Sequence, residues 1–377
     1  MIGRSGFLLL VFLNGVWSGP RGPAEPALTR ALHWLASQQQ ADGGFSNGFS
    51  PVSDPGTTAD VVLGIVAAGQ DPQAWSSAGK TPLDFLEATA ASGLGGNAGL
   101  TAKMALAVSA AGLNPRRFGG RNLLAQIQRQ MDVSTGLFGS GPFDSSLAIL
   151  ALAATGGNLP AGAVEGLLRS RLEDGSFSFS GDRTAGAGDS NTTALAIQAL
   201  WAAGEQQEIA PSLEYLRRLQ NEDGGWTYQK PSPFGEETDA NSTALAIEAL
   251  ASVGEDLADW GNAVPALLAL QRASGAFAFN ADTSGNNLLA TVQALPALAA
   301  ARGFVPPSPP TATASLAPAS TSTPTPLPVQ PPPTPASAAP VGGGAGGGIG
   351  VAALALVIAL GLGWWIGRQT PEGRRPT

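Results

Sequence analysis

The chain has 377 residues, of which 44 % are hydrophobic and only 13 % charged, so it holds enough apolar material for a large buried core. It has no cysteine and a single histidine, His33. Disulfides, thiolate metal sites and a cysteine nucleophile are thereby excluded, and a metal site, a Ser-His-Asp triad or another cofactor is not expected. The formal net charge is −8, and because phosphate binding needs clustered Lys and Arg, a nucleic-acid partner is not expected.

The first segment, residues 1–18, has the three parts of a signal peptide. Arg4 supplies the positive charge, residues 6–16 are apolar, and Val16 and Ser18 occupy the outer positions of a small-residue cleavage site. The alternative is an uncleaved N-terminal anchor. The apolar run is short for a membrane span, which favours cleavage.

Residues 26–303 alternate amphipathic with apolar helices. Helices with charges on one face are predicted at 27–40, 83–91, 122–131, 163–172, 213–221 and 263–272. Between them lie six Ala- and Leu-rich copies of one segment, which are apolar nearly all round and therefore expected to be buried on all sides. Their equivalent positions are Thr58, Thr101, Ser145, Thr193, Thr243 and Leu288. Six charged helices outside six apolar ones predict a closed all-α ring, an (α/α)6 toroid of six helical hairpins; an open solenoid is the alternative.

The turn after most outer helices carries a glycine and then an aromatic residue. We expect the rings of Phe45, Phe177, Trp226 and Phe277 to fill the gaps between neighbouring outer helices. The second repeat, near Leu94, has no such aromatic. His33 lies on the first outer helix, where a surface or packing role is expected rather than a catalytic one.

The C-terminal part changes composition. Residues 305–345 form a Pro/Ser/Thr- and Gly-rich linker that cannot pack a core. Residues 349–366 are uncharged and mainly apolar, with Trp364 and Trp365 near the end and arginines beyond, which predicts a transmembrane helix with a cytoplasmic tail at 367–377. The expected location is therefore the plasma membrane, spanned once, with the toroid outside the cell and the membrane as a partner.

One motif carries a family resemblance. Gln220-x-x-x-Gly224-x-Trp226 resembles the QW repeat of squalene and oxidosqualene cyclases, and Gln39-x-x-x-Gly43-x-Phe45 and Gln271-x-x-x-Gly275-x-Phe277 are close variants. The resemblance covers residues 26–303. It implies the (α/α)6 toroid that those cyclases share with protein prenyltransferase β subunits, complement-like thioester domains and transcobalamin-type carriers.

The chemistry of those relatives is mostly missing at the matching positions. The cyclases protonate their substrate with the middle Asp of Asp-x-Asp-Asp-Thr-Ala, and the two matching segments, 239–244 and 189–194, have Asn241 and Asn191 there. An amide cannot act as that acid. The prenyltransferase zinc site and the thioester both need a cysteine. The carrier branch is not contradicted, so the resemblance favours non-catalytic binding of a small amphipathic ligand, cobalamin-like or isoprenoid, or of a surface partner. The alternative is a terpene cyclase- or prenyltransferase-type enzyme with a non-standard acid.

Polar residues at the starts of the apolar helices are the candidate site, because those starts gather at one mouth of a closed ring. A polar mouth is a default ligand site, although each side chain is equally suited to cap its helix. Any catalytic acid is expected among Asp189, Asp239 and Glu237. The candidate ligand-binding residues are Asp144, Asp189, Asn191, Asp239, Asn241 and Asn287.

Two further columns of the repeat are polar. Asp60 and Lys103 occupy equivalent positions in neighbouring repeats, so ring closure predicts an ion pair between them, structural or functional. Gln198, Glu248 and Gln293 are assigned to another column. That column either lines the cavity or lies against the outer helices.

Overall fold

The computed structural model of the protein describes residues 22–232 and 235–303. The predicted signal peptide 1–18, linker 305–345, transmembrane helix 349–366 and tail 367–377 lie outside the described residues. Among the residues that are described, no helix is both long and apolar enough to span a bilayer.

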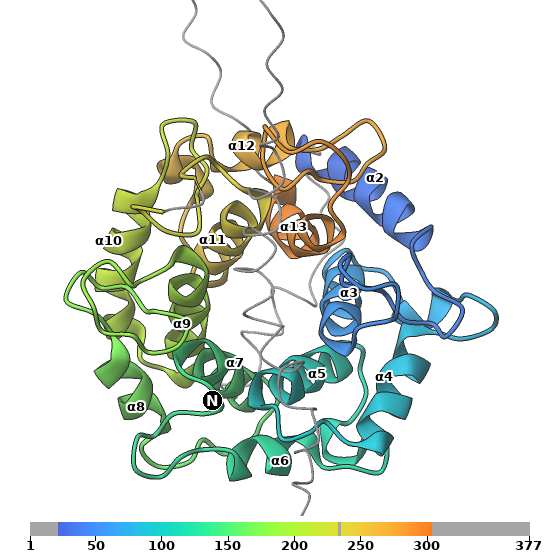
Figure 1. The fold of residues 1–377 in the computed structure, drawn as a ribbon, viewed down its shortest axis with the longest axis horizontal. Coiled ribbons are helices and arrows are strands. Elements are labelled where there is room, and N and C mark those ends of the chain that lie inside the picture. Colours follow the sequence, from blue (N-terminus) through green and yellow to red (C-terminus); the bar gives the residue numbers. More distant parts are fainter. Residues whose placement is uncertain (1–21, 233–234, 304–377) are drawn as a thin grey trace, which may run out of the picture. The chain divides into compact units, whose positions relative to one another are not determined.

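The described part of the chain consists of α-helices, short 3-10 turns and isolated β-bridges, as the all-helical prediction requires. The α-helices alternate along the sequence between an outer and an inner ring (Figure 1). The outer helices are α2 (Ala24–Ala36), α4 (Pro82–Ser92), α6 (Leu123–Arg129), α8 (Ala163–Ser170), α10 (Ala210–Leu219) and α12 (Ala263–Ala269). The inner helices are α3 (Pro55–Ala67), α5 (Ala98–Ala110), α7 (Pro142–Ala154), α9 (Ser190–Ala203), α11 (Ala240–Ser252) and α13 (Leu288–Ala300).

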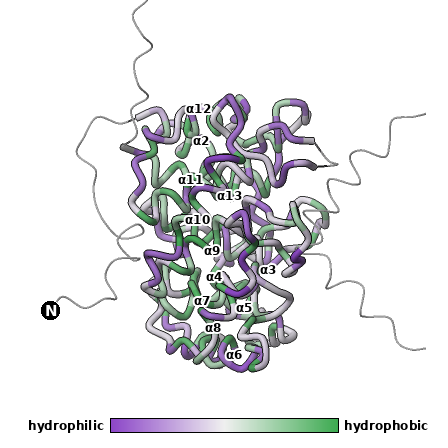
Figure 2. Tube along the Cα trace, turned by 90° about the vertical axis from the view of Figure 1, so that its left-hand side faces the viewer, coloured by the Kyte–Doolittle hydropathy of each residue, from purple (hydrophilic) through white to green (hydrophobic). Residues whose placement is uncertain are grey.

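The ring is closed, so the solenoid alternative is wrong. The last inner helix, α13, packs against both α3 and α2, and Gly64 of α3 leaves room for Leu295 of α13. Polar contacts seal the same seam: Gln271 Nε2 donates to the Ala27 carbonyl at 2.8 Å, and Arg302 pairs with Glu25 at 2.8 Å. In Figure 2 the hydrophobic stretches lie along the helices and the hydrophilic ones mainly in the connecting segments.

Five of the six outer helices end two to four residues before their predicted ends. After three of them, α2, α10 and α12, the side chain of the QW-type glutamine closes a turn instead of continuing the helix. The Nε2 atoms of Gln39, Gln220 and Gln271 donate to the carbonyls of Gly43, Gly224 and Gly275 at 2.8 to 2.9 Å. Those glycines have φ between 88° and 95°, a region that residues with a side chain rarely adopt.

Hydroxyl side chains connect five of the six inner helices, all except α5, to the aromatic turn that precedes each of them. The hydroxyls of Thr58, Ser145, Thr193, Thr243 and Thr291 accept the backbone N–H of Phe45, Phe138, Phe177, Trp226 and Phe277 at 2.8 to 3.0 Å. All five aromatic side chains are fully buried, as a plug between outer helices requires. We call the five hydroxyl residues, together with Thr101, the Ser/Thr column.

This column corrects the register of the sixth repeat. The repeat pattern predicts Leu288 at the position of Thr243, but the residue that binds the aromatic turn is Thr291. The cap agrees, since Asp239 and Asn287 each lie four residues before Thr243 and Thr291. The sixth repeat therefore begins three residues later than predicted.

Candidate functional site

The inner helices keep one side accessible, and that side faces the centre of the ring. Their other sides are covered by neighbouring inner helices or by the outer ring, so the exposed surface that remains must lie toward the interior (Figure 1). Relative to the Ser/Thr column, the positions that face the interior are +2 and +5; on α7 and α9 the residues at these positions are themselves buried, at 5 to 7 % exposed. The +2 layer is Asp60, Lys103, Leu147, Leu195, Leu245 and Gln293, and the +5 layer is Leu63, Leu106, Leu150, Gln198, Glu248 and Pro296.

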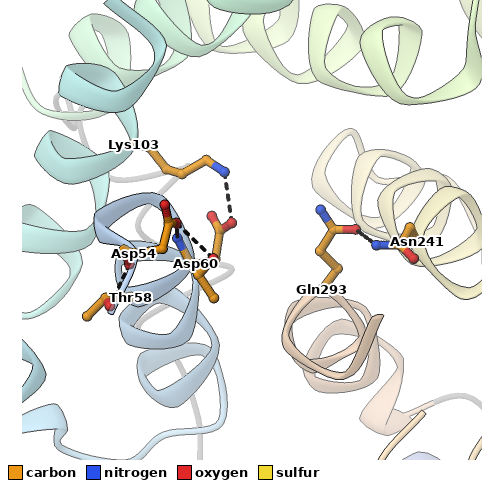
Figure 3. A network of polar contacts seen from close by, with 7 residues as sticks. Asp54, Thr58, Asp60, Lys103, Asn241 and Gln293 are labelled. Atoms are coloured by element: carbon orange, nitrogen blue, oxygen red, sulfur yellow. Dashed lines mark hydrogen bonds and ion pairs between the residues drawn. The ribbon is translucent and has the colours of Figure 1, made fainter. Parts of the chain in front are cut away.

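The predicted ion pair is present in the +2 layer. Lys103 Nζ lies 2.8 Å from Asp60 Oδ2, and both side chains are about four-fifths buried, at 19 % and 18 % exposed. In Figure 3 the pair extends from α3 and α5 into the interior. Burial raises the pKa of Asp60, and the ammonium of Lys103 opposes that shift. The ion pair holds α3 and α5 together and also presents a charge to the interior.

An amide pair lies on the other side of the interior in the same view. Asn241 Nδ2 donates to Gln293 Oε1, which joins α11 to α13 (Figure 3). The corrected register puts Gln293 in the +2 layer with Asp60 and Lys103, so its assignment to the column of Gln198 and Glu248 was wrong. Pro296 occupies that place instead.

Four buried side-chain atoms on the described inner helices have no hydrogen-bond partner: Thr192 Oγ1, Gln198 Nε2, Asn241 Oδ1 and Ser242 Oγ. Gln198 belongs to the +5 layer and Asn241 is bonded to Gln293 of the +2 layer, and these two residues are 7 % and 5 % exposed. Buried polar atoms are nearly always paired with protein, water or ligand. An unmet acceptor on α11 and an unmet donor on α9 are therefore available to a bound molecule.

Glu248 adds a carboxyl group to the +5 layer. Burial, and after it the negative charge of Asp60, raises the pKa of Glu248 to about 7, while Lys103 opposes the shift. The pKa of Glu248 on α11 therefore depends partly on the two charges of the ion pair between α3 and α5. Its carboxyl is about half ionised near neutral pH, which makes it responsive to any charge that enters the ring.

The two aspartates proposed as weak acids are helix caps. Asp189 Oδ1 and Asp239 Oδ1 accept the N–H of Thr192 and Ser242, each at 2.7 Å, and the residues are only 1 % and 3 % exposed. Burial raises the pKa of Asp189 to about 7 and that of Asp239 to about 6, against those hydrogen bonds. These pKa values would suit an acid near neutral pH, but both residues are buried at the starts of their helices and do not line the interior.

The remaining candidates divide between caps and interior. Asn287 caps α13 by accepting the Ala290 N–H at 2.9 Å. Asp144 lies in the first turn of α7, where it binds Ser140 at the backbone and the hydroxyl, and Gly141 holds the cap position. Glu237 is exposed in the segment before α11. Asn191 and Asn241, two residues before the Ser/Thr column, are the candidates nearest the interior layers.

Sequence reasoning missed both the leucines of the interior and a tyrosine cluster. The chain's two tyrosines gather at Asp189, and burial followed by the charge of Asp189 raises the pKa of both Tyr215 and Tyr228. Tyr215 donates to the Gly188 carbonyl at 3.0 Å. The leucines could have been found from the sequence, because they lie two or five residues after the repeated Ser or Thr.

A second hollow lies outside the ring, between α2 and the 3-10 turn Pro72–Ala74. His33 and Trp75 line it, and the indole of Trp75 donates to Gln70 Oε1 at 3.1 Å. Its lining residues include no Asp, Glu, Lys or Arg, and the His33 side chain is exposed. Within the described residues, no cluster of three or more His, Asp or Glu side chains is arranged to hold a metal ion.

A scan against protein-family models and a search of the curated proteins find no match for this chain. Solved structures do match. A protein from Actinoplanes is 19 % identical over 74 % of this chain and 99 % of its own, with a TM-score of 0.57. The type II terpene cyclase MstE from Scytonema is 15 % identical over 75 % of this chain and 98 % of its own, with a TM-score of 0.54.

A variant of MstE, solved with its substrate geranylgeranyl dihydroxybenzoate, gives a TM-score of 0.52 at 14 % identity over 75 % of this chain and 98 % of its own. Haptocorrin, solved with Cbi, is 16 % identical over 72 % of this chain and 66 % of its own, with a TM-score of 0.48. At these identities the likeness concerns the fold. The chain thus has the toroid fold of type II terpene cyclases, which confirms the resemblance drawn from the QW-type turns.

Proposed function

We propose that the protein binds a small amphipathic ligand inside its ring and performs no chemistry on it. The observation that carries this proposal is the uneven distribution of polar groups over the interior layers. The α7 and α9 side holds Leu147, Leu150 and Leu195 with one amide, Gln198, whereas all the ionisable residues, Asp60, Lys103 and Glu248, and also Gln293, lie among apolar residues on the α11, α13, α3 and α5 side. A pocket of mainly apolar lining with a few convergent polar groups suits a ligand with both characters.

The positions of the three acids expected from the sequence support binding over catalysis. A general acid must lie within hydrogen-bond reach of the atom it protonates. Asn241 stands where the resemblance puts the acid of the cyclases, and Asp189 and Asp239 are buried as caps. Glu237 lies outside the interior. The fold of MstE, which accepts an isoprenoid with a polar head, favours a ligand of similar size.

Extraction of the purified full-length protein tests the proposal. We expect mass spectrometry of the extract, with absorbance for a corrinoid, to find one amphipathic compound in a fixed ratio to protein. Leu195→Trp should fill the α7 and α9 side of the interior and lose that compound, while Leu213→Trp on outer helix α10 should retain it.

Turnover would favour the alternative function. If the protein converts geranylgeranyl dihydroxybenzoate or another polyprenyl substrate through many cycles, it is an enzyme with a non-standard acid. Glu248 would then be the first residue to replace, because it is the one interior carboxyl in the described layers that no cation neutralises directly.

The location of the domain belongs to the same proposal. Residues 1–18 as a signal peptide and 349–366 as a membrane span place the ring outside the cell. Protease added to intact cells should release a fragment that contains residues 26–303. If the ring survives in intact cells and is cut only after lysis, the proposed orientation is wrong.

A further inference from the structure

The two faces of the ring differ in charge. Each segment that leads from an outer helix to an inner helix ends at the same face, because the helices of a hairpin are antiparallel; we call it the mouth face. Its six segments, 37–54, 93–97, 130–141, 171–189, 220–239 and 270–287, carry 13 Asp or Glu and four Lys or Arg. The five segments of the opposite face, 68–81, 111–122, 155–162, 204–209 and 253–262, carry six acidic and four basic residues.

This asymmetry favours the entry of cations through the mouth. Clefts lined by one sign of charge concentrate ligands of the opposite sign and speed their association. An anionic ligand, such as a diphosphate or a carboxylate, would have to cross the same field at a cost.

The formal charges of the interior layers sum to a negative value, the same sign as the mouth face. The +2 and +5 layers contain two carboxyl groups, Asp60 and Glu248, and one ammonium, Lys103. Lys103 is already paired with Asp60 at 2.8 Å. Within these layers no cation is left for an anionic head group, whereas Glu248 has a carboxyl that an entering cation would keep ionised.

An unmet acceptor points to a ligand that donates hydrogen bonds. Asn241 Oδ1 is buried without a partner on α11, the helix that also carries Glu248. A buried acceptor without a partner costs about 1 to 3 kcal/mol, and an N–H group of a ligand would remove that cost. This observation is independent of the acidic mouth, and both favour a ligand with an N–H group. The unmet donor Gln198 Nε2 on α9 would bind an acceptor elsewhere on the same ligand.

We propose that the ring selects cationic amphiphiles, molecules with a compact apolar body and a protonated amine or a similar N–H cation. The inference rests on the proposed binding function and narrows its ligand class. The apolar body contacts Leu147, Leu150 and Leu195, and the cation lies between Glu248 and the ion pair on the opposite side.

Three probes with one hydrocarbon body test this selectivity: 1-adamantylamine, 1-adamantanol and adamantane-1-carboxylate. Titration calorimetry on the full-length protein at pH 8 should give the tightest binding for the amine, at least about tenfold tighter than for the carboxylate. Glu248→Gln should remove most of that preference. Glu87→Gln, a matched change on the exposed face of outer helix α4, should leave it within twofold.

The outcomes separate the two proposals. If the three probes bind equally, or the carboxylate binds best, the cation selectivity is refuted but interior binding stands. If none of them binds at millimolar concentration, and extraction of the protein also yields no ligand, the proposed function fails as well. The comparison of the three probes on the unmodified protein needs no variant, so poor folding of Glu248→Gln leaves it decisive.

Discussion

Single hydroxyl groups hold the aromatic turns to the inner helices. Thr243 Oγ1 accepts the backbone N–H of Trp226 at 3.0 Å. Because Trp226 is fully buried, water could not replace this hydrogen bond if the hydroxyl were removed. Thr101 has no aromatic turn to bind, and its hydroxyl donates to Asn97 of its own helix at 2.6 Å. The same residue type at the same repeat position therefore has two different structural roles.

Replacing Thr243 by Ala should lower the free energy of unfolding by about 1 to 3 kcal/mol, the cost of leaving a buried donor unpaired. Thr101→Ala is the matched control and should cost less than about 1 kcal/mol, since only a bond within its own helix is lost. Urea unfolding followed by circular dichroism measures both. Equal losses would show that the bond to Trp226 contributes nothing.

Glu248 should make the stability of the protein fall as the pH rises. Its pKa is about 7 in the folded protein against an ordinary value of 4.5. The folded state therefore favours the protonated form, and the stability present below pH 4.5 is lost as the pH rises through 7. Asp60 on α3 and Lys103 on α5 are the charges that act on it.

We expect Glu248→Gln to melt a few degrees above the unmodified protein at pH 8 and within about one degree of it at pH 5. Thermal melts across that range measure the difference. Asp60 keeps part of the pH dependence, because burial raises its pKa too. A variant that gains nothing at pH 8 would mean that Glu248 is well solvated.

At the scale of the elements, the caps of the inner helices decide between two roles for the same aspartates. Asp239 accepts the Ser242 N–H at 2.7 Å and Asp189 accepts the Thr192 N–H at the same distance. Asn is as good a cap as Asp, whereas Ala cannot cap. A cap role therefore tolerates Asn, and an acid role does not.

Asp239→Asn should be at least as stable as the unmodified protein at pH 8, because the raised pKa of Asp239 makes its charge unfavourable there. Asp239→Ala should lose about 0.5 to 2 kcal/mol. Thermal unfolding of the two variants side by side tests this. If Asn destabilises as much as Ala, the carboxylate has a role beyond capping.

The elements also show where sequence reasoning succeeds and where it stops. The Ala- and Leu-rich composition and the caps were enough to find five inner helices in register. The sixth was misplaced because Asn287-Leu288-Leu289-Ala290 offers an apolar match that starts too early. Only the bond from the Phe277 N–H to Thr291 fixes the register, and that bond joins residues 14 apart.

For the site, the sequence predicted the Asp60–Lys103 pair, since both residues replace leucines at one repeat position. It could not separate caps from interior groups, because Asp189 and Asn191 are only two residues apart, yet Asp189 is buried and Asn191 is half-buried. The pKa of Glu248 is raised first by burial and then by the charge of Asp60 on another helix, against the effect of Lys103. Such effects appear only once the ring is closed.

At the scale of the whole molecule, closure depends on the contact between α3 and α13. A Cβ added at Gly64 would lie 2.5 Å from Leu295 Cδ1, so only glycine lets the two helices approach this closely. Gly64→Ala should destabilise the protein by about 1 to 3 kcal/mol through overpacking.

A double-mutant cycle tests whether this contact exists. Leu295→Ala alone should cost about 2 to 5 kcal/mol, and the two changes together should cost less than their sum by at least about 0.5 kcal/mol. Chemical denaturation of the four proteins gives the coupling. Strict additivity would indicate that the two residues do not touch and that the ring is open at this seam.

The central claim is that the interior of the closed ring is the binding site, and a crystal structure of the full-length protein with 1-adamantylamine tests it most directly. We predict density for the amine inside the ring, with its nitrogen near Glu248 and its hydrocarbon against Leu195. Density only in the outer hollow beside His33 and Trp75, or an interior closed by the protein's own side chains, would contradict the claim.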